Sequence, residues 1–137
     1  LTILCLFSLF LVAMWDECPH GNIVKAINSI GNSQKILELC YGSYAKVWKW
    51  VRENVKENEV VATTDFRLYY YNKTVIEFTS WKLRNLFHTT DPHEWEQIFK
   101  SNGVKYVVIT QPATTKYVEH FGKLVKKIDE KQIYRIK

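Results

Sequence analysis

DPHEWEQIFKSNGVKYVVIT, residues 91–110, predicts one helix followed by one buried strand. Asp91 is a typical helix N-cap residue, and Pro92 suits the first helical position, where no N–H donor is needed. Gly103 predicts the end of the helix, because glycine adopts the left-handed conformation without a Cβ clash. The near-continuous apolar run at 104–109 is typical of a strand covered on both faces. This stretch therefore predicts an α/β architecture.

A second helix and strand precede this stretch. Residues 44–58 are amphipathic, with charged residues opposite an apolar face at helical spacing. That face comprises Val47, Trp48, Val51 and Val55. Residues 60–64 then form a short apolar segment typical of a buried strand. We expect two successive helix–strand units on one sheet, joined by right-handed crossovers.

The remaining segments complete a small sheet. Residues 74–78 predict another strand, which is entered through a turn at Asn72. A helix is expected from Thr114 or Thr115 to about residue 123, and a hairpin follows over 124–136. The last part of the hairpin alternates apolar and polar residues, as a half-buried edge strand does. The predicted fold is a small, mostly parallel sheet flanked by helices, with a C-terminal hairpin.

The N-terminal segment, residues 1–14, carries no charge. It could be the core of a signal peptide, a buried helix of a soluble protein, or the end of a transmembrane helix. We favour the last, because the segment is apolar on every face and is followed by Trp15 and the charged pair at 16–17. The predicted organisation is therefore the end of a transmembrane helix at 1–15, a juxtamembrane connector at 16–41, and a soluble α/β domain at 42–137.

Charge and cysteine content exclude little. The net charge is +5, but the lysines are scattered and often lie beside Glu or Asp, so we expect a solvated surface and no nucleic-acid partner. A nucleic-acid binder remains an alternative that rests on charge alone. Cys18 and Cys40 could pair in an oxidising compartment, although nothing in their spacing requires it.

Motifs for catalysis are absent from the sequence. It contains no glycine-rich phosphate loop, no GxSxG, no HExxH and no cluster of residues at metal-binding spacing. We therefore predict no catalytic residue, no metal site and no cofactor within this chain.

The best-placed polar residues for a site follow the first predicted strand. Asp65 and Arg67 stand there, and ligands of open α/β sheets bind outside the carboxyl ends of the strands. Tyr69 and Tyr70 could extend such a site, so these four residues are the ligand-binding candidates. In the alternative interpretation, Asp65 caps the next turn and pairs with Arg67, while the tyrosines fill the space between helix and sheet. Asn72 begins an N-glycosylation sequon, which would matter only outside the cytosol.

Three segments carry a resemblance to a known group of proteins: WVRENVKENEVVATTDFRLYYYNKTVI at 50–76, FKSNGVKYVVI at 99–109 and VKKIDEKQIYRIK at 125–137. With the uncharged segment that precedes them, they resemble the C-terminal soluble domain of multi-spanning membrane glycosyltransferases. These are GT-C type enzymes related to protein mannosyltransferases that use polyprenyl- or dolichyl-phosphate-linked sugars. The resemblance covers roughly residues 45–137.

The resemblance implies an accessory domain rather than a catalytic one. In that family the catalytic carboxylate lies in an early external loop between membrane helices, so no catalytic residue is carried over to this chain. Asp65, Arg67, Tyr69 and Tyr70 become candidates for contact with an acceptor or with the membrane body. The implied location is the membrane, with the soluble domain on the extracytoplasmic side. The implied partners are membrane lipid, the upstream membrane domain, and a lipid-linked sugar or its acceptor.

A second hypothesis belongs to another class of function. The chain could be a membrane-tethered ligand-binding module without catalytic activity. In that case the corner formed by Asp65, Arg67 and Tyr70 would hold a small polar ligand or a sugar.

Overall fold

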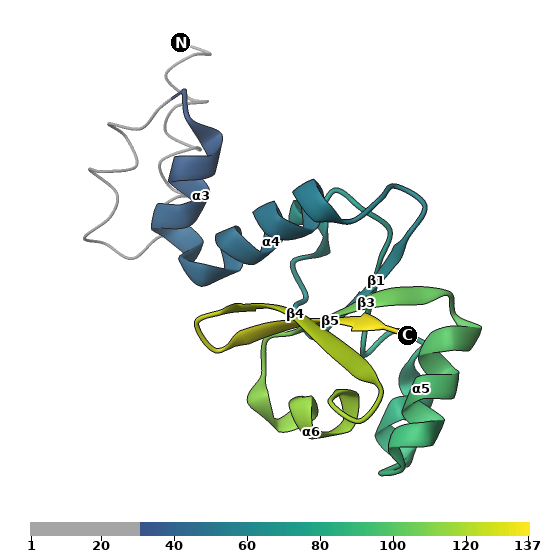
Figure 1. Cartoon of the computed structure of the whole chain (residues 1–137). Coiled ribbons are helices and arrows are strands. Elements are labelled where there is room, and N and C mark those ends of the chain that lie inside the picture. The colour runs from purple at the N-terminus through teal and green to yellow at the C-terminus, as the bar shows by residue number, and fades with distance from the viewer. Residues whose placement is uncertain (1–30) are drawn as a thin grey trace. The chain divides into compact units, whose positions relative to one another are not determined.

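The computed structural model of the chain describes residues 31–137 (Figure 1). The chain divides into two compact units between Lys46 and Val47. The predicted end of a transmembrane helix at 1–15 and residues 16–30 of the predicted connector lie outside the described residues. Within 31–137, no helix has both the length and the apolar character needed to span a bilayer.

The described part of the first unit contains helix α3, Ser33–Tyr41, and the start of helix α4, Ser43–Asn54. Asn32 caps α3, because its side chain accepts a hydrogen bond from the Lys35 backbone N–H at 3.0 Å. Cys40 is disulfide-bonded. The chain's two other cysteines, Cys5 and Cys18, both lie outside the described residues.

The second unit is built on one five-stranded sheet with the order β2-β1-β3-β5-β4. Its strands are β1 Val60–Thr63, β2 Val75–Glu77, β3 Val104–Ile109, β4 Gly122–Ile128 and β5 Lys131–Ile136. β1 pairs in parallel with both β2 and β3, whereas β3 with β5 and β5 with β4 are antiparallel. The parallel strands with a C-terminal hairpin confirm the predicted architecture.

Helices cover both faces of this sheet. Helix α5, Pro92–Ser101, and the short helix α6, Thr115–Val118, lie on one face (Figure 1). The main apolar core lies there, around Trp95, Phe99 and Val107. On the other face, residues 47–54 of α4 cover the sheet, and Trp50 packs edge-on against Tyr106 of β3, with ring centroids 6.2 Å apart. Both predicted helix–strand units are therefore present.

Helix α5 begins and ends as its sequence predicts. Asp91 is the N-cap, and its Oδ1 accepts a hydrogen bond from the His93 N–H at 2.9 Å. Pro92 occupies the first turn, and Gly103 takes a positive φ of +70° directly after the helix. The chain can therefore turn into β3 at once, which places Val107 and Ile109 beneath the helix that precedes them.

Two predicted helices are longer than the observed ones. α4 ends at Asn54 rather than at residue 58, because the chain turns at 56–59, where Glu59 Oε2 accepts from the Lys56 N–H at 2.9 Å. α6 ends at Val118 rather than near residue 123. The reason is that Gly122 already pairs with Ile136 in the hairpin, so the backbone there belongs to β4.

The prediction that the last strand of the chain is an edge strand was wrong. β5, whose alternating pattern suggested an edge, lies between β3 and β4, and the outer strand is β4. Along β5, Ile133, Tyr134 and Ile136 are buried and Arg135 is exposed, so the alternation marks how the residues face and not an outer position in the sheet. β4 carries the exposed Lys123, Lys126 and Lys127, and charged side chains of this kind oppose pairing with a further strand.

Candidate functional site

The carboxyl ends of β1 and β3 lie side by side, and the chain leaves them toward opposite faces of the sheet. After β1 it enters the 3₁₀ turn η2, Leu68–Tyr70, where Tyr70 stacks on Trp48 of α4. After β3 it enters the 3₁₀ turn η4, Pro112–Thr114, and then α6, where Tyr117 stacks on Trp95 of α5. Such a divergence is a topological switch point, where open α/β sheets bind their ligands.

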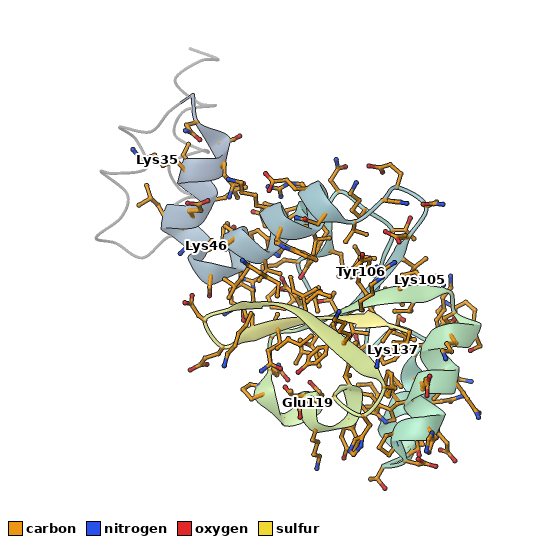
Figure 2. All side chains as sticks on the ribbon, viewed as in Figure 1. Lys35, Lys46, Lys105, Tyr106, Glu119 and Lys137 are labelled. Carbon is orange, nitrogen blue, oxygen red and sulfur yellow. The ribbon has the colours of Figure 1, made fainter. Side chains whose placement is uncertain are left out.

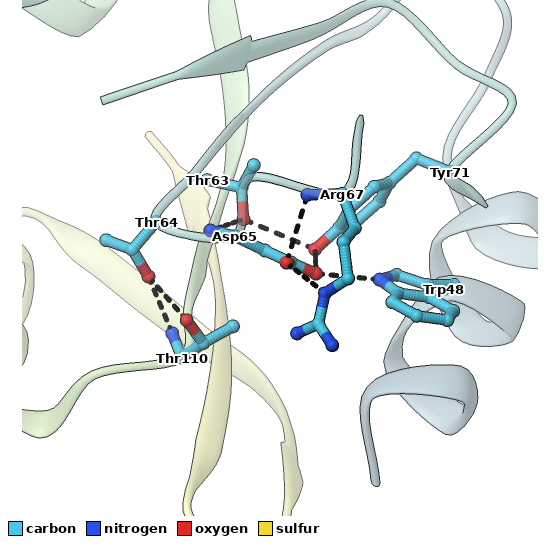
Figure 3. A network of polar contacts seen from close by, with 7 residues as sticks. All are labelled: Trp48, Thr63, Thr64, Asp65, Arg67, Tyr71 and Thr110. Atoms are coloured by element: carbon cyan, nitrogen blue, oxygen red, sulfur yellow. Dashed lines mark hydrogen bonds and ion pairs between the residues drawn. The ribbon is translucent and has the colours of Figure 1, made fainter. Parts of the chain in front are cut away.

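Two threonines join the strand ends at this switch point. The hydroxyls of Thr64 and Thr110 lie 2.9 Å apart, and the Thr110 backbone N–H donates to Thr64 Oγ1, also at 2.9 Å (Figure 3). The Thr64 N–H donates to the Val108 carbonyl at 3.2 Å. These bonds fix the separation of the two departing loops.

Asp65 is the centre of a buried polar network on the β1 side of the switch point (Figure 3). Its side chain is buried, with the residue only 2% exposed. Asp65 Oδ2 accepts from Trp48 Nε1 at 2.8 Å and from the Tyr71 hydroxyl at 3.3 Å. Asp65 Oδ1 accepts from the Arg67 side chain at 2.9 Å and from its backbone N–H at 3.2 Å. Both carboxylate oxygens are thus bonded inside the protein.

This geometry matches the alternative interpretation of the sequence, in which Asp65 caps the next turn and pairs with Arg67. A buried carboxylate that accepts four hydrogen bonds positions its neighbours. Asp65 therefore holds α4, through Trp48, against the start of η2. Ligand binding at this corner stays a prediction. It concerns the exposed residues next to Asp65 and not the buried carboxylate itself.

A column of three aromatic rings leads from the buried Trp48 to the exposed Tyr69 at this corner. Trp48, Tyr70 and Tyr69 follow one another, with centroid separations of 4.3 Å for the first pair and 4.0 Å for the second. The Arg67 guanidinium carbon lies 5.3 Å from the Trp48 ring centroid and 5.1 Å from that of Phe66. Tyr69 and Phe66 are 71% and 73% exposed. The corner thus presents a cation between aromatic faces, an arrangement that suits a ligand with both polar groups and a flat apolar side.

The buried network raises the pKa of the Tyr71 hydroxyl. Burial raises the pKa of Tyr71 well above its usual value near 10, and the adjacent Asp65 carboxylate raises that pKa further. The folded protein therefore keeps this proton at pH values where the unfolded chain has lost it.

The free energy of unfolding should consequently fall as the pH rises above about 10. Because the folded protein retains the Tyr71 proton, the fall is up to about 1.4 kcal/mol per pH unit. Below that pH the contribution is present in full. We expect Tyr71→Phe to reduce the slope of unfolding free energy against pH between about pH 10 and 11. Urea denaturation at stepped pH measures this slope, and an unchanged slope in the variant would contradict the assignment.

The fold has a solved counterpart. It is similar to the crystal structure of the C-terminal globular domain of an oligosaccharyltransferase from Archaeoglobus fulgidus, with a TM-score of 0.53 at 16% sequence identity. The similarity covers 69% of this chain and 97% of that domain. No protein-family profile and no curated protein sequence matches the chain. The likeness therefore shows a shared fold.

The structure brings together most of the residues that the sequence singled out. Asp65 and Arg67 are in contact, and Tyr69 and Tyr70 extend the ring column beside them. Asn72 stands apart from the network, exposed in the turn before β2 with a φ of +50°. Among residues 31–137, no group of three or more His, Cys, Asp or Glu side chains could hold a metal ion.

Sequence reasoning missed four members of the site: Thr63, Thr64, Tyr71 and Thr110. Thr63 Oγ1 accepts from the Asp65 backbone N–H at 3.0 Å and lies 3.2 Å from the Tyr71 hydroxyl. Sequence reasoning also assigned Trp48 to apolar packing alone, whereas the indole N–H donates to Asp65. Thr64 and Thr110 carried a usable signal, because each directly follows a buried strand. Tyr71 carried none that separates it from Tyr69 and Tyr70, since only the direction of η2 turns it inward.

Proposed function

We propose that this chain is an accessory C-terminal domain of a membrane glycosyltransferase that transfers a sugar from a polyprenyl-phosphate-linked donor. The observation that carries the proposal is the fold shared with almost the whole of an oligosaccharyltransferase C-terminal domain. The resemblance of residues 45–137 to enzymes related to protein mannosyltransferases supports the finer assignment. In this proposal the catalytic residues belong to the membrane body.

The proposed location is the membrane, with the α/β domain on the extracytoplasmic side. The disulfide at Cys40 supports this side, because structural disulfides persist in oxidising compartments. The exposed sequon at Asn72 is compatible with it. The uncharged residues 1–14 would be the end of the last membrane helix.

Within this function, we assign the corner of Arg67, Phe66, Tyr69 and Tyr70 to contact with the acceptor or with the membrane body. The exposed rings supply apolar area, and Arg67 supplies a fixed cation. Asp65 has a positioning role there, since its oxygens are bonded within the protein.

Sugar transfer by membranes that contain the full-length gene product tests the proposal. The donor is a radiolabelled sugar on polyprenyl phosphate, and the comparison is a variant that lacks residues 47–137. We expect the deletion to lower transfer at least tenfold while the membrane body still inserts. Equal transfer by both proteins, or a gene product with a single apolar span, would overturn the proposal.

The second candidate function is a membrane-tethered module that binds a sugar or another polar ligand without transferring it. The ring column, with Arg67 over the Trp48 ring at one end, favours this candidate to the same extent as acceptor contact. Binding of a free sugar that Tyr69→Ala abolishes, in a gene product that shows no transfer, would select it.

A further inference from the structure

The end of the sheet opposite the switch point carries a pocket of about 450 Å³. β3 and β4 begin there and β5 ends there, close to the turn that leads into β1. The pocket is lined by six residues: Glu59, Lys105, Lys123, Arg135, Ile136 and Lys137. Figure 2 marks Lys105 beside Tyr106 near the start of β3, and Lys137 at the end of the chain beyond β5.

Strand register explains why these basic residues converge. Antiparallel pairing sets Arg135 opposite both Lys123 of β4 and Tyr106 of β3. Between β1 and β3 the register shifts, since Val60 pairs with Val104 but Val61 pairs with Tyr106. Lys105 therefore has no partner in β1, and a bulge of this kind changes the direction of the side chains next to it.

The cations of this pocket lack counter-charges within the described part of the chain. Lys105, Lys123, Arg135 and Lys137 form no ion pair with any residue of 31–137. The one acidic lining residue, Glu59, is already bonded to the Lys56 backbone N–H. The Arg135 guanidinium carbon lies 5.9 Å from the Tyr106 ring centroid, so the ring restricts its position. Four cationic side chains thus face one pocket with a single acidic side chain, that of Glu59, among them.

We propose that this pocket binds phosphate groups. Several positive charges gathered in a concave site create a positive potential, which favours an anion of more than one charge. Arginine's planar fork fits two phosphate oxygens at once, and the lysines add point charges that do not require one fixed geometry. The volume is that of small-molecule sites. The pocket lies away from the Asp65 network, so this site does not depend on the proposed sugar transfer.

The bound phosphate group could belong to a soluble phosphate compound or to the headgroup of an anionic lipid. Isothermal titration of the 137-residue chain with inorganic pyrophosphate at low ionic strength tests the first source. Flotation with vesicles of phosphatidylglycerol, compared with phosphatidylcholine vesicles, tests the second. The pocket variants are Arg135→Gln and Lys105→Gln. Arg84→Gln and Lys127→Gln are matched controls that remove the same charge from exposed positions that do not line the pocket.

We expect each pocket variant to weaken binding about tenfold or more, because each removes a charge-assisted hydrogen bond. The control variants should change binding less than about threefold, since they alter only the screened field of the surface. This pattern with pyrophosphate assigns a soluble ligand, and the same pattern with anionic vesicles alone assigns a lipid headgroup. Absence of binding to both, or equal losses in pocket and control variants, would overturn the proposal. The circular dichroism of each variant shows that lost binding is not lost folding.

Discussion

Replacing Asp65 with alanine is expected to destabilise the second unit by about 3–5 kcal/mol. The substitution leaves the Trp48 indole N–H and the Tyr71 hydroxyl buried without the acceptor that they share, and it removes the ion-pair partner of Arg67. Domains of this size are stable by about 5–15 kcal/mol, so the loss is a large part of the total. Urea denaturation followed by circular dichroism measures it.

Two further variants show how much of this loss comes from the charge of Asp65 and how much any lost surface carboxylate would cause. Asp65→Asn keeps the shape but turns one acceptor into a donor, so we expect a smaller loss of about 1–3 kcal/mol. Glu130→Ala removes a carboxylate from the exposed β4–β5 turn and should change stability by less than about 0.5 kcal/mol. If Asp65→Ala were as mild as Glu130→Ala, the network around Asp65 would not have the structural role assigned to it.

Replacing Trp48 with alanine should cost a similar amount, about 3–5 kcal/mol, for a different physical reason. The side chain is fully buried, and its removal leaves a cavity between α4 and η2 while unstacking Tyr70. Trp81→Ala is the matched control, because Trp81 is 76% exposed and its truncation opens no cavity. Unfolding in urea with a circular dichroism readout applies to all of these variants.

Trp48→Phe tests the hydrogen bond separately from the packing. Phenylalanine retains much of the apolar volume but cannot donate to Asp65, so we expect a loss of about 1–3 kcal/mol. Equal losses in the alanine and phenylalanine variants would show that the indole N–H, not the ring, accounts for the stability. Because Trp48 and Asp65 are in contact, their effects should not add in the double variant.

Most of the helices and strands could be predicted from local patterns, although the order of the last two strands in the sheet could not. Asp91, Pro92 and Gly103 fix the ends of one helix by backbone chemistry alone, and the apolar run of β3 marks a strand with both faces covered. The C-terminal ends of α4 and α6 could not be predicted from local patterns. Glu59 ends the first through a side-chain bond, and Gly122 ends the second by pairing with Ile136, a residue far along the chain. Local propensity contains neither interaction.

The candidate site was predictable only in its position. The rule that ligands bind beyond strand ends selected Asp65 and Arg67, and the structure does bring them together. Whether Asp65 faces a ligand or the protein depends on Trp48, which comes 17 residues earlier on a different element. Periodicity placed Trp48 on the apolar face of its helix, but it says nothing about where the indole N–H points.

The order β2-β1-β3 also affects how the protein is made. Strand β1 leaves a ribosome well before its neighbour β3, because β2 and α5 lie between them in the sequence. Until residues 104–109 emerge, the side of β1 that pairs with β3 has no backbone partner. The nascent chain must therefore keep this open sheet edge from aggregating during elongation, and the sheet can be completed only once β5 has been synthesised.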